Sequence, residues 1–151
     1  MAATHFSGPV IAGDLQQGET NGPNQGAVIL SQSTSITQNS TTAVSSTLYI
    51  PAGSRILDFN VDVLTAFNSA TSATLSVGLT AGGTDYVSGV NVKAATGRIA
   101  PTYTAAQLAA MNGVTVLGVA APTTAPVVVT VTPSGATSAG YVVVTMLYVQ
   151  Q

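Results

Sequence analysis

Apolar and polar residues alternate along several short segments of the chain, and a period of two is typical of β-strands with one buried face. The alternation is clearest at residues 56–64, where four apolar residues are expected to face the core: Leu57, Phe59, Val61 and Val63. Residues 74–80 repeat the pattern, and their expected inward residues are Leu75, Val77 and Leu79.

The same reasoning predicts further strands at residues 27–30, 47–50, 86–92, 127–132 and 140–149. Residues 31–46 are rich in Ser, Thr, Gln and Asn and fit either an edge strand or a long loop. The last segment is apolar on both faces: Tyr141, Val143, Leu147 and Val149 alternate with Val142, Val144, Met146 and Tyr148. Such a strand is buried on both sides, either in the middle of a sheet or at a subunit interface.

Turn residues separate these short strands, as at Pro51–Ser54 and Ala81–Gly83. One short helix is predicted after Thr104, because Thr104 and Gln107 have the spacing of a capping box and Asn112-Gly113 ends the segment. Many short strands with frequent turns favour an antiparallel β-sandwich or jelly roll. We therefore expect residues 27–151 to form one all-β, jelly-roll-like domain with one short helix.

Residues 1–26 are predicted to be an extended N-terminal arm, because glycine and proline recur there too often for regular structure. One interpretation is a disordered tail. The other is an arm that becomes ordered against a neighbouring molecule. The second explains why the segment contains apolar or aromatic residues that could act as anchors, namely His5, Phe6, Val10, Ile11 and Leu15.

Charged residues are unusually scarce. They make up 5% of the chain, against about 25% in ordinary soluble domains. Residues 20–54 and 99–151 contain no Asp, Glu, Lys or Arg. Because charge keeps monomers apart in solution, this composition predicts that other protein covers much of the surface. The chain is therefore expected to be a component of an assembly.

Several classes of protein are disfavoured by composition. The three basic residues, Arg55, Lys93 and Arg98, cannot form the basic patch that nucleic-acid binding requires. No apolar run is long enough for a membrane span, and residues 1–10 do not resemble a secretory signal. The absence of cysteine excludes disulfides and thiolate metal sites, which fits synthesis in a reducing cytoplasm.

The residues needed for catalysis are also scarce. The single histidine, His5, lies in the predicted arm, so a catalytic triad is not expected. Asp58 and Asp62 begin like a calcium loop, but the required glycine and the final glutamate are replaced by Val63 and Ser69. These two carboxylates fit a solvated strand face, an ion pair with Arg55 or Arg98, or a weak metal site. We predict no enzymatic activity, no cofactor and no metal.

Four segments carry a resemblance that covers most of the chain. They are the opening Ala3–Val10 (ATHFSGPV), Ile50–Ile56 (IPAGSRI) leading into the strand at 58–65, Gly82–Val87 (GGTDYV) and the closing Tyr148–Gln150 (YVQ). Together they resemble small structural proteins of tailed bacteriophages, in particular head decoration (cement) proteins. The likeness is one of pattern rather than of a single diagnostic motif.

The resemblance implies a protein made in the host bacterial cytoplasm that binds the outside of the mature capsid and stabilises it. Its partners would be the major capsid protein and further copies of itself, most often as a trimer but also as a dimer. The expected interface residues are His5, Phe6, Val10 and Ile11 of the arm and Tyr141, Val143, Met146 and Tyr148 of the last strand.

Two other functions stay open at this point. One is a fibre or tail-associated module that binds host glycan, for which Tyr86, Tyr103 and Asp85 could serve. The other is a major shell or tube subunit, for which the chain is short and poor in cations.

Overall fold

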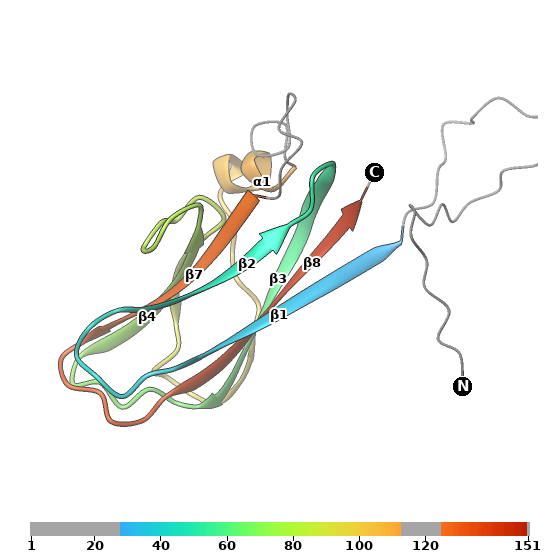
Figure 1. Cartoon of the computed structure of the whole chain (residues 1–151). Coiled ribbons are helices and arrows are strands. Elements are labelled where there is room, and N and C mark those ends of the chain that lie inside the picture. Colours follow the sequence, from blue (N-terminus) through green and yellow to red (C-terminus); the bar gives the residue numbers. More distant parts are fainter. Residues whose placement is uncertain (1–27, 113–124, 151) are drawn as a thin grey trace, which may run out of the picture.

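The computed structural model describes residues 28–112 and 125–150 and consists of two four-stranded antiparallel sheets packed face to face (Figure 1). The first sheet has the order β1-β8-β3-β6, formed by Ile29–Thr37, Tyr141–Gln150, Ser54–Thr65 and Gly97–Ile99. The second has the order β2-β7-β4-β5, formed by Val44–Ile50, Ala125–Ser134, Ser72–Gly78 and Val87–Asn91. These sheets confirm the predicted all-β sandwich.

The strand pairs are nested along the chain. The first strand pairs with the last, β2 with β7, β3 with β6 and β4 with β5, and successive pairs fall in alternate sheets. The β1–β8 register is continuous from Ile29 opposite Val149 to Thr37 opposite Tyr141. Strand β1 therefore begins, and β8 ends, at the same end of the sandwich (Figure 1).

The core lies between the sheets and is filled mainly by valine, with a few larger side chains such as Phe59, Phe67 and Tyr86. The predicted inward residues Phe59, Val61, Val63, Leu75 and Val77 are all buried. The rings of Phe59 and Tyr86 pack with their centroids 6.2 Å apart. Because buried side chains alternate along the central strands β3 and β8, apolar burial explains the faces of the first sheet.

Two residues predicted to face inward do not do so. The register between β3 and β8 shifts between Ile56 and Asp58, so Ile56 occupies the core position and Leu57 is only half-buried. A bulge of this kind changes which side chains face inward. Leu79 follows the end of β4 at Gly78 and is 39% exposed, because the chain there turns and its backbone N–H donates to Asp85.

Residues 31–46 resolve into an edge strand, a connecting loop and the start of β2. Strand β1 forms the edge of the first sheet and continues to Thr37. Gln38 is buried just after it, and its side-chain amide donates to the carbonyl oxygens of Ser40 and Thr42. This amide holds the loop that leads into β2, which is the edge of the second sheet.

The predicted helix is confirmed as α1, Ala105–Met111. Its capping box is reciprocal: Gln107 N donates to Thr104 Oγ1 at 3.3 Å, and Thr104 N donates to Gln107 Oε1 at 2.9 Å. Met111 packs into the core and attaches the helix to the sandwich. Within residues 28–112 and 125–150, no helix is long and apolar enough to cross a membrane.

Candidate interaction surface

Charge is confined to one part of the described molecule. All of its Asp, Glu, Lys and Arg residues fall between residues 55 and 98. They lie on β3 and β6 and in the loops that flank β5, which contain Asp85 and Lys93. Strands β1, β2, β7 and β8 contain none, and we call these four strands the uncharged half.

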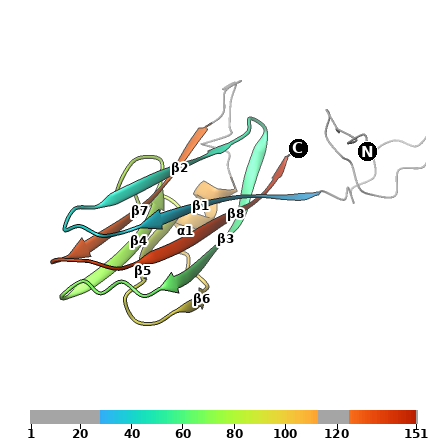
Figure 2. The same ribbon diagram turned by 60° about the horizontal axis from the view of Figure 1, so that its bottom comes forward.

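The nested topology brings the four strands of the uncharged half together although they come from opposite ends of the sequence. Strand β1 pairs with β8, and β2 pairs with β7. The two sheets are linked on this side by a hydrogen bond between the hydroxyls of Thr34 on β1 and Ser46 on β2. In Figure 2, β1 and β2 occupy one side of the sandwich and β5 and β6 the opposite side. Two uncharged stretches of sequence thus come together on one side of the sandwich.

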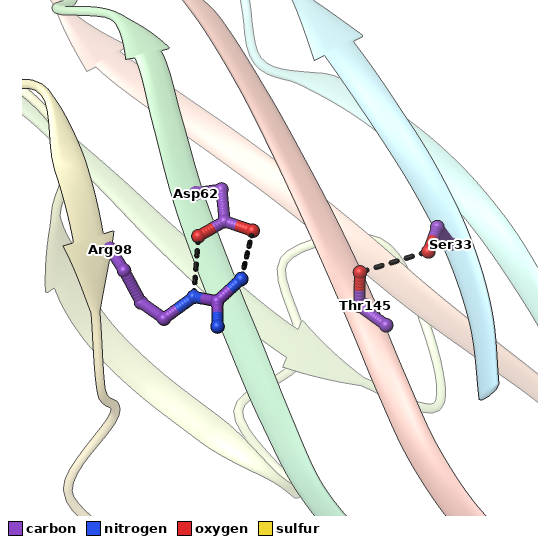
Figure 3. A network of polar contacts seen from close by, with 4 residues as sticks. All are labelled: Ser33, Asp62, Arg98 and Thr145. Carbon is purple, nitrogen blue, oxygen red and sulfur yellow. Dashed lines mark hydrogen bonds and ion pairs between the residues drawn. The ribbon is translucent and has the colours of Figure 1, made fainter. Parts of the chain in front are cut away.

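The outer face of β1 and β8 carries small hydroxyl groups beside half-buried apolar side chains. Ser33 and Thr145 lie opposite each other in the register, and their hydroxyls are 2.8 Å apart (Figure 3). Tyr141, Val143 and Leu147 share this face and are half-buried. On the β3 side this face is bordered by charge, because Asp62 lies opposite Val143 and Asp58 opposite Leu147 in the register. On the β1 side it is neutral, and a neutral surface suits a broad protein contact.

The outer face of β2 and β7 is also neutral. Ser45 lies opposite Thr130, and their hydroxyls are 2.8 Å apart. The loop after β4 covers Thr130, because Gly82 N donates to its hydroxyl at 2.9 Å. Tyr49 on β2, in a sheet whose four strands contain no charged residue, is 56% exposed. The lack of charge at residues 20–54 pointed to this face, but the sequence did not single out Tyr49.

The charged side of the first sheet is organised by an ion pair. Arg98 on β6 donates from Nε and Nη2 to the two carboxylate oxygens of Asp62 on β3, at 2.7 and 2.9 Å (Figure 3). These hydrogen bonds lower the pKa of Asp62 from its ordinary value. Of the sequence alternatives, the ion pair with Arg98 is therefore confirmed for Asp62.

Asp58 takes part in a separate contact. Its Oδ1 accepts hydrogen bonds from the Tyr103 hydroxyl, at 2.5 Å, and from Phe59 N, at 2.8 Å. Burial, followed by the bond to Asp58, raises the pKa of Tyr103. The two carboxylates thus have different protein partners, and the described residues contain no group of three or more His, Asp or Glu side chains that could hold a metal.

The predicted interface residues of the last strand separate onto two faces. Tyr141 and Val143 lie on the outer face of β8, within the uncharged half. Met146 and Tyr148 lie on the inner face and are 0% and 7% exposed, so their place in the core removes them from any surface contact. Central position in the sheet, one of the two sequence alternatives, explains why both faces of β8 are apolar. His5, Phe6, Val10 and Ile11 lie outside the described residues.

The residues considered for glycan binding do not form a common site. Tyr86 is fully buried, and burial followed by the nearby charge of Asp85 raises its pKa to about 12. An open hollow of about 440 Å³ does lie beside α1 and includes Asp85, Ser88 and Gln107. No aromatic side chain lines this hollow, so it lacks the ring on which a sugar could stack.

Comparisons with known proteins place the fold. The sequence matches no protein-family model, and no curated protein matches it. Among solved structures, the chain is similar to one in the capsid asymmetric unit of cyanophage Pam1, with a TM-score of 0.58 and 21% sequence identity. The match covers 89% of this chain and 95% of that chain. At this level of identity the likeness is one of fold.

Proposed function

We propose that this protein is a structural component of a bacteriophage virion that binds the outer surface of the capsid and stabilises it, as a head decoration (cement) protein. The observation that carries the proposal is the likeness of fold, over nearly the whole of both chains, to a chain in a cyanophage capsid asymmetric unit. Its direct partner would be the major capsid protein.

The size of the neighbouring chain favours decoration over shell formation. Because the match covers 95% of that chain and 89% of this one, the neighbour is slightly shorter than 151 residues. A chain of this size is short for the shell-forming subunit of a tailed phage. The two sheets with nested strand pairs are moreover compatible with a jelly roll, an architecture found in viral capsid proteins, and this supports the proposal.

The uncharged half supplies a surface suited to permanent contact. Interface cores are depleted in charged residues relative to the rest of a protein surface. Here four strands present hydroxyls and apolar side chains without a single ionised group, and Tyr141 and Val143 are partly exposed among them. We propose that the outer face of β1 and β8 lies against capsid protein. We also propose that residues 1–26 form an arm whose anchors are His5, Phe6, Val10 and Ile11.

The test is co-sedimentation with empty, expanded capsid shells of the phage that encodes the chain. The full-length protein should pellet with the shells at a fixed stoichiometry. Deletion of residues 1–12 should abolish pelleting while the circular dichroism spectrum stays that of the β-domain. A matched control in the same segment, Gln16→Ala with Gln17→Ala, should bind as the unaltered protein does.

The contribution of the β8 face can be separated from that of the arm. Val143→Gln should weaken pelleting, because it places an amide in the proposed contact, whereas Thr74→Gln on the outer face of β4 should not. Failure of the full-length protein to bind shells would contradict the proposal. If the deletion variant binds as well as the full-length protein, the proposed role of the arm is wrong.

A further inference from the structure

The two lateral sides of the sandwich differ in how their edge strands are protected. On one side the edges are β6, which has three residues, and β5, which has five. The ion pair of Arg98 with Asp62 lies beside β6, and Tyr103 donates to Asp58 where β3 extends past β6. The register of β5 with β4 is interrupted. Short strands, charges and bulges are the usual means by which proteins prevent edge-to-edge pairing.

Among the described residues, the opposite side has none of these protections. Its edges are β1, with nine residues, and β2, with seven, and both keep an unbroken register with their inner neighbours. Neither strand contains a charged residue or a proline. An edge of this length leaves a row of backbone N–H and C=O groups without strand partners, which is a template for another strand.

The side chains at the start of β1 point to the same conclusion. Ile29 is 61% exposed and Leu30 is 38% exposed, although both belong to a regular strand. Farther along β1 the outer-face residues are Ser31, Ser33 and Ser35, which are small and neutral. A strand that meets its own copy must carry no net charge, because like charges would be brought face to face, and β1 meets this condition.

We infer that β1 pairs with β1 of a second copy of this chain in antiparallel orientation about a twofold axis. The β1-β8-β3-β6 sheets of two molecules would then form one continuous eight-stranded sheet. Such an interface is isologous, so it closes after two copies. It therefore specifies the dimer rather than the trimer that resemblance to decoration proteins implies. Because it concerns the isolated protein, it does not depend on capsid binding.

The test is the mass of the purified full-length protein by sedimentation equilibrium. The unaltered chain should be a dimer. Ser35→Lys places an ammonium group on the exposed face of the edge strand, a charge of the kind that prevents edge-to-edge pairing, and it should yield a monomer. Thr74→Lys, at a position that is also exposed but lies on the inner strand β4, is the matched control and should remain a dimer.

Ser31→Lys provides a second variant in case Ser35→Lys fails to fold. A cooperative thermal transition is required of each variant as evidence that it is folded. A monomeric or trimeric unaltered protein would overturn the inference. So would a dimer that survives in folded Ser35→Lys and Ser31→Lys. Binding to capsid shells is measured separately with the same variants. A failure of the capsid proposal can therefore be told apart from a failure of the dimer.

Discussion

Gly140 lies directly against the ring of Phe67. A Cβ atom added at Gly140 would come within 2.3 Å of Phe67 Cδ1 and within 2.7 Å of two further ring atoms. Phe67 is 1% exposed and belongs to the core, so movement of its ring would disturb the buried side chains. The chain at this point is also fixed by a hydrogen bond from Gln38 N to the Gly140 carbonyl oxygen.

Gly140→Ala should therefore destabilise the domain by about 1–3 kcal/mol, the usual cost of overpacking a core. Chemical denaturation monitored by circular dichroism would measure the loss. The double variant with Phe67→Leu should recover part of the deficit, because the smaller side chain makes room for the added methyl group. Strictly additive effects of the two substitutions would show that the ring is not the obstacle.

Tyr103→Phe should lower the free energy of unfolding by about 1–2 kcal/mol at neutral pH, because it removes a hydrogen bond to the Asp58 carboxylate. The pKa of Tyr103 is raised in the folded state. Its stabilising contribution is thus fully present below the ordinary value of 10 and is lost as the pH rises toward the folded-state pKa.

The difference in the free energy of unfolding between Tyr103→Phe and the unaltered protein should accordingly become smaller at alkaline pH. Tyr86, whose pKa is raised to about 12, adds a second loss of stability between about pH 10 and 12 that both proteins share. Tyr49→Phe, at an exposed position, is the control and should change little. A difference that stays constant at alkaline pH would argue against the bond to Asp58.

Asp62→Asn should have a small effect on stability at neutral pH, because the ion pair with Arg98 is exposed to solvent. The folded-state pKa of Asp62 lies below 3.8, so its contribution is present above that pH and is lost as the pH falls further. Melting curves of the two proteins should therefore converge in acid. They should also converge at high salt, because salt screens the ion pair. A difference between the two melting temperatures that salt does not change would assign the effect to packing.

Thr104→Ala should cost about 1 kcal/mol, the typical value for removal of an N-cap side chain. The hydroxyl of Thr104 is the acceptor for Gln107 N, and without it this end of α1 loses one partner. Hydrogen exchange at the amide of Gln107 should become faster. Thr104→Ser keeps the hydroxyl and should preserve protection at Gln107.

Periodicity was sufficient to predict most of the strands and the sandwich class, because burial of one face controls both. It did not predict the three-residue strand β6, and it left the extent of β1 open. The alternation at residues 59–63 and the capping box at Thr104 are local signals, and the structure has both as expected. Leu57 and Leu79 departed from the pattern for reasons that depend on a neighbouring strand or loop: the register shift opposite Tyr148 and the contact of Asp85 with Leu79.

The pairing of strands had no local signal. The positions of β1 and β2 at adjacent edges, and hence the assembly of the uncharged half, follow from contacts between residues far apart in sequence, such as Ile29 and Val149. For the same reason the sequence could not separate Val143, on the outer face, from Met146, in the core. Lack of charge predicted an interaction surface, and the topology shows where the uncharged strands lie.

The segregation of charge has a practical consequence for chemical labelling. The single lysine of the sequence, Lys93, lies in the loop between β5 and β6, at the opposite side of the sandwich from β1 and β2 (Figure 2). An amine-reactive dye or affinity tag attached to this side chain would leave every strand of the uncharged half unmodified. The fold thus provides one built-in attachment point on the face directed away from β1 and β2.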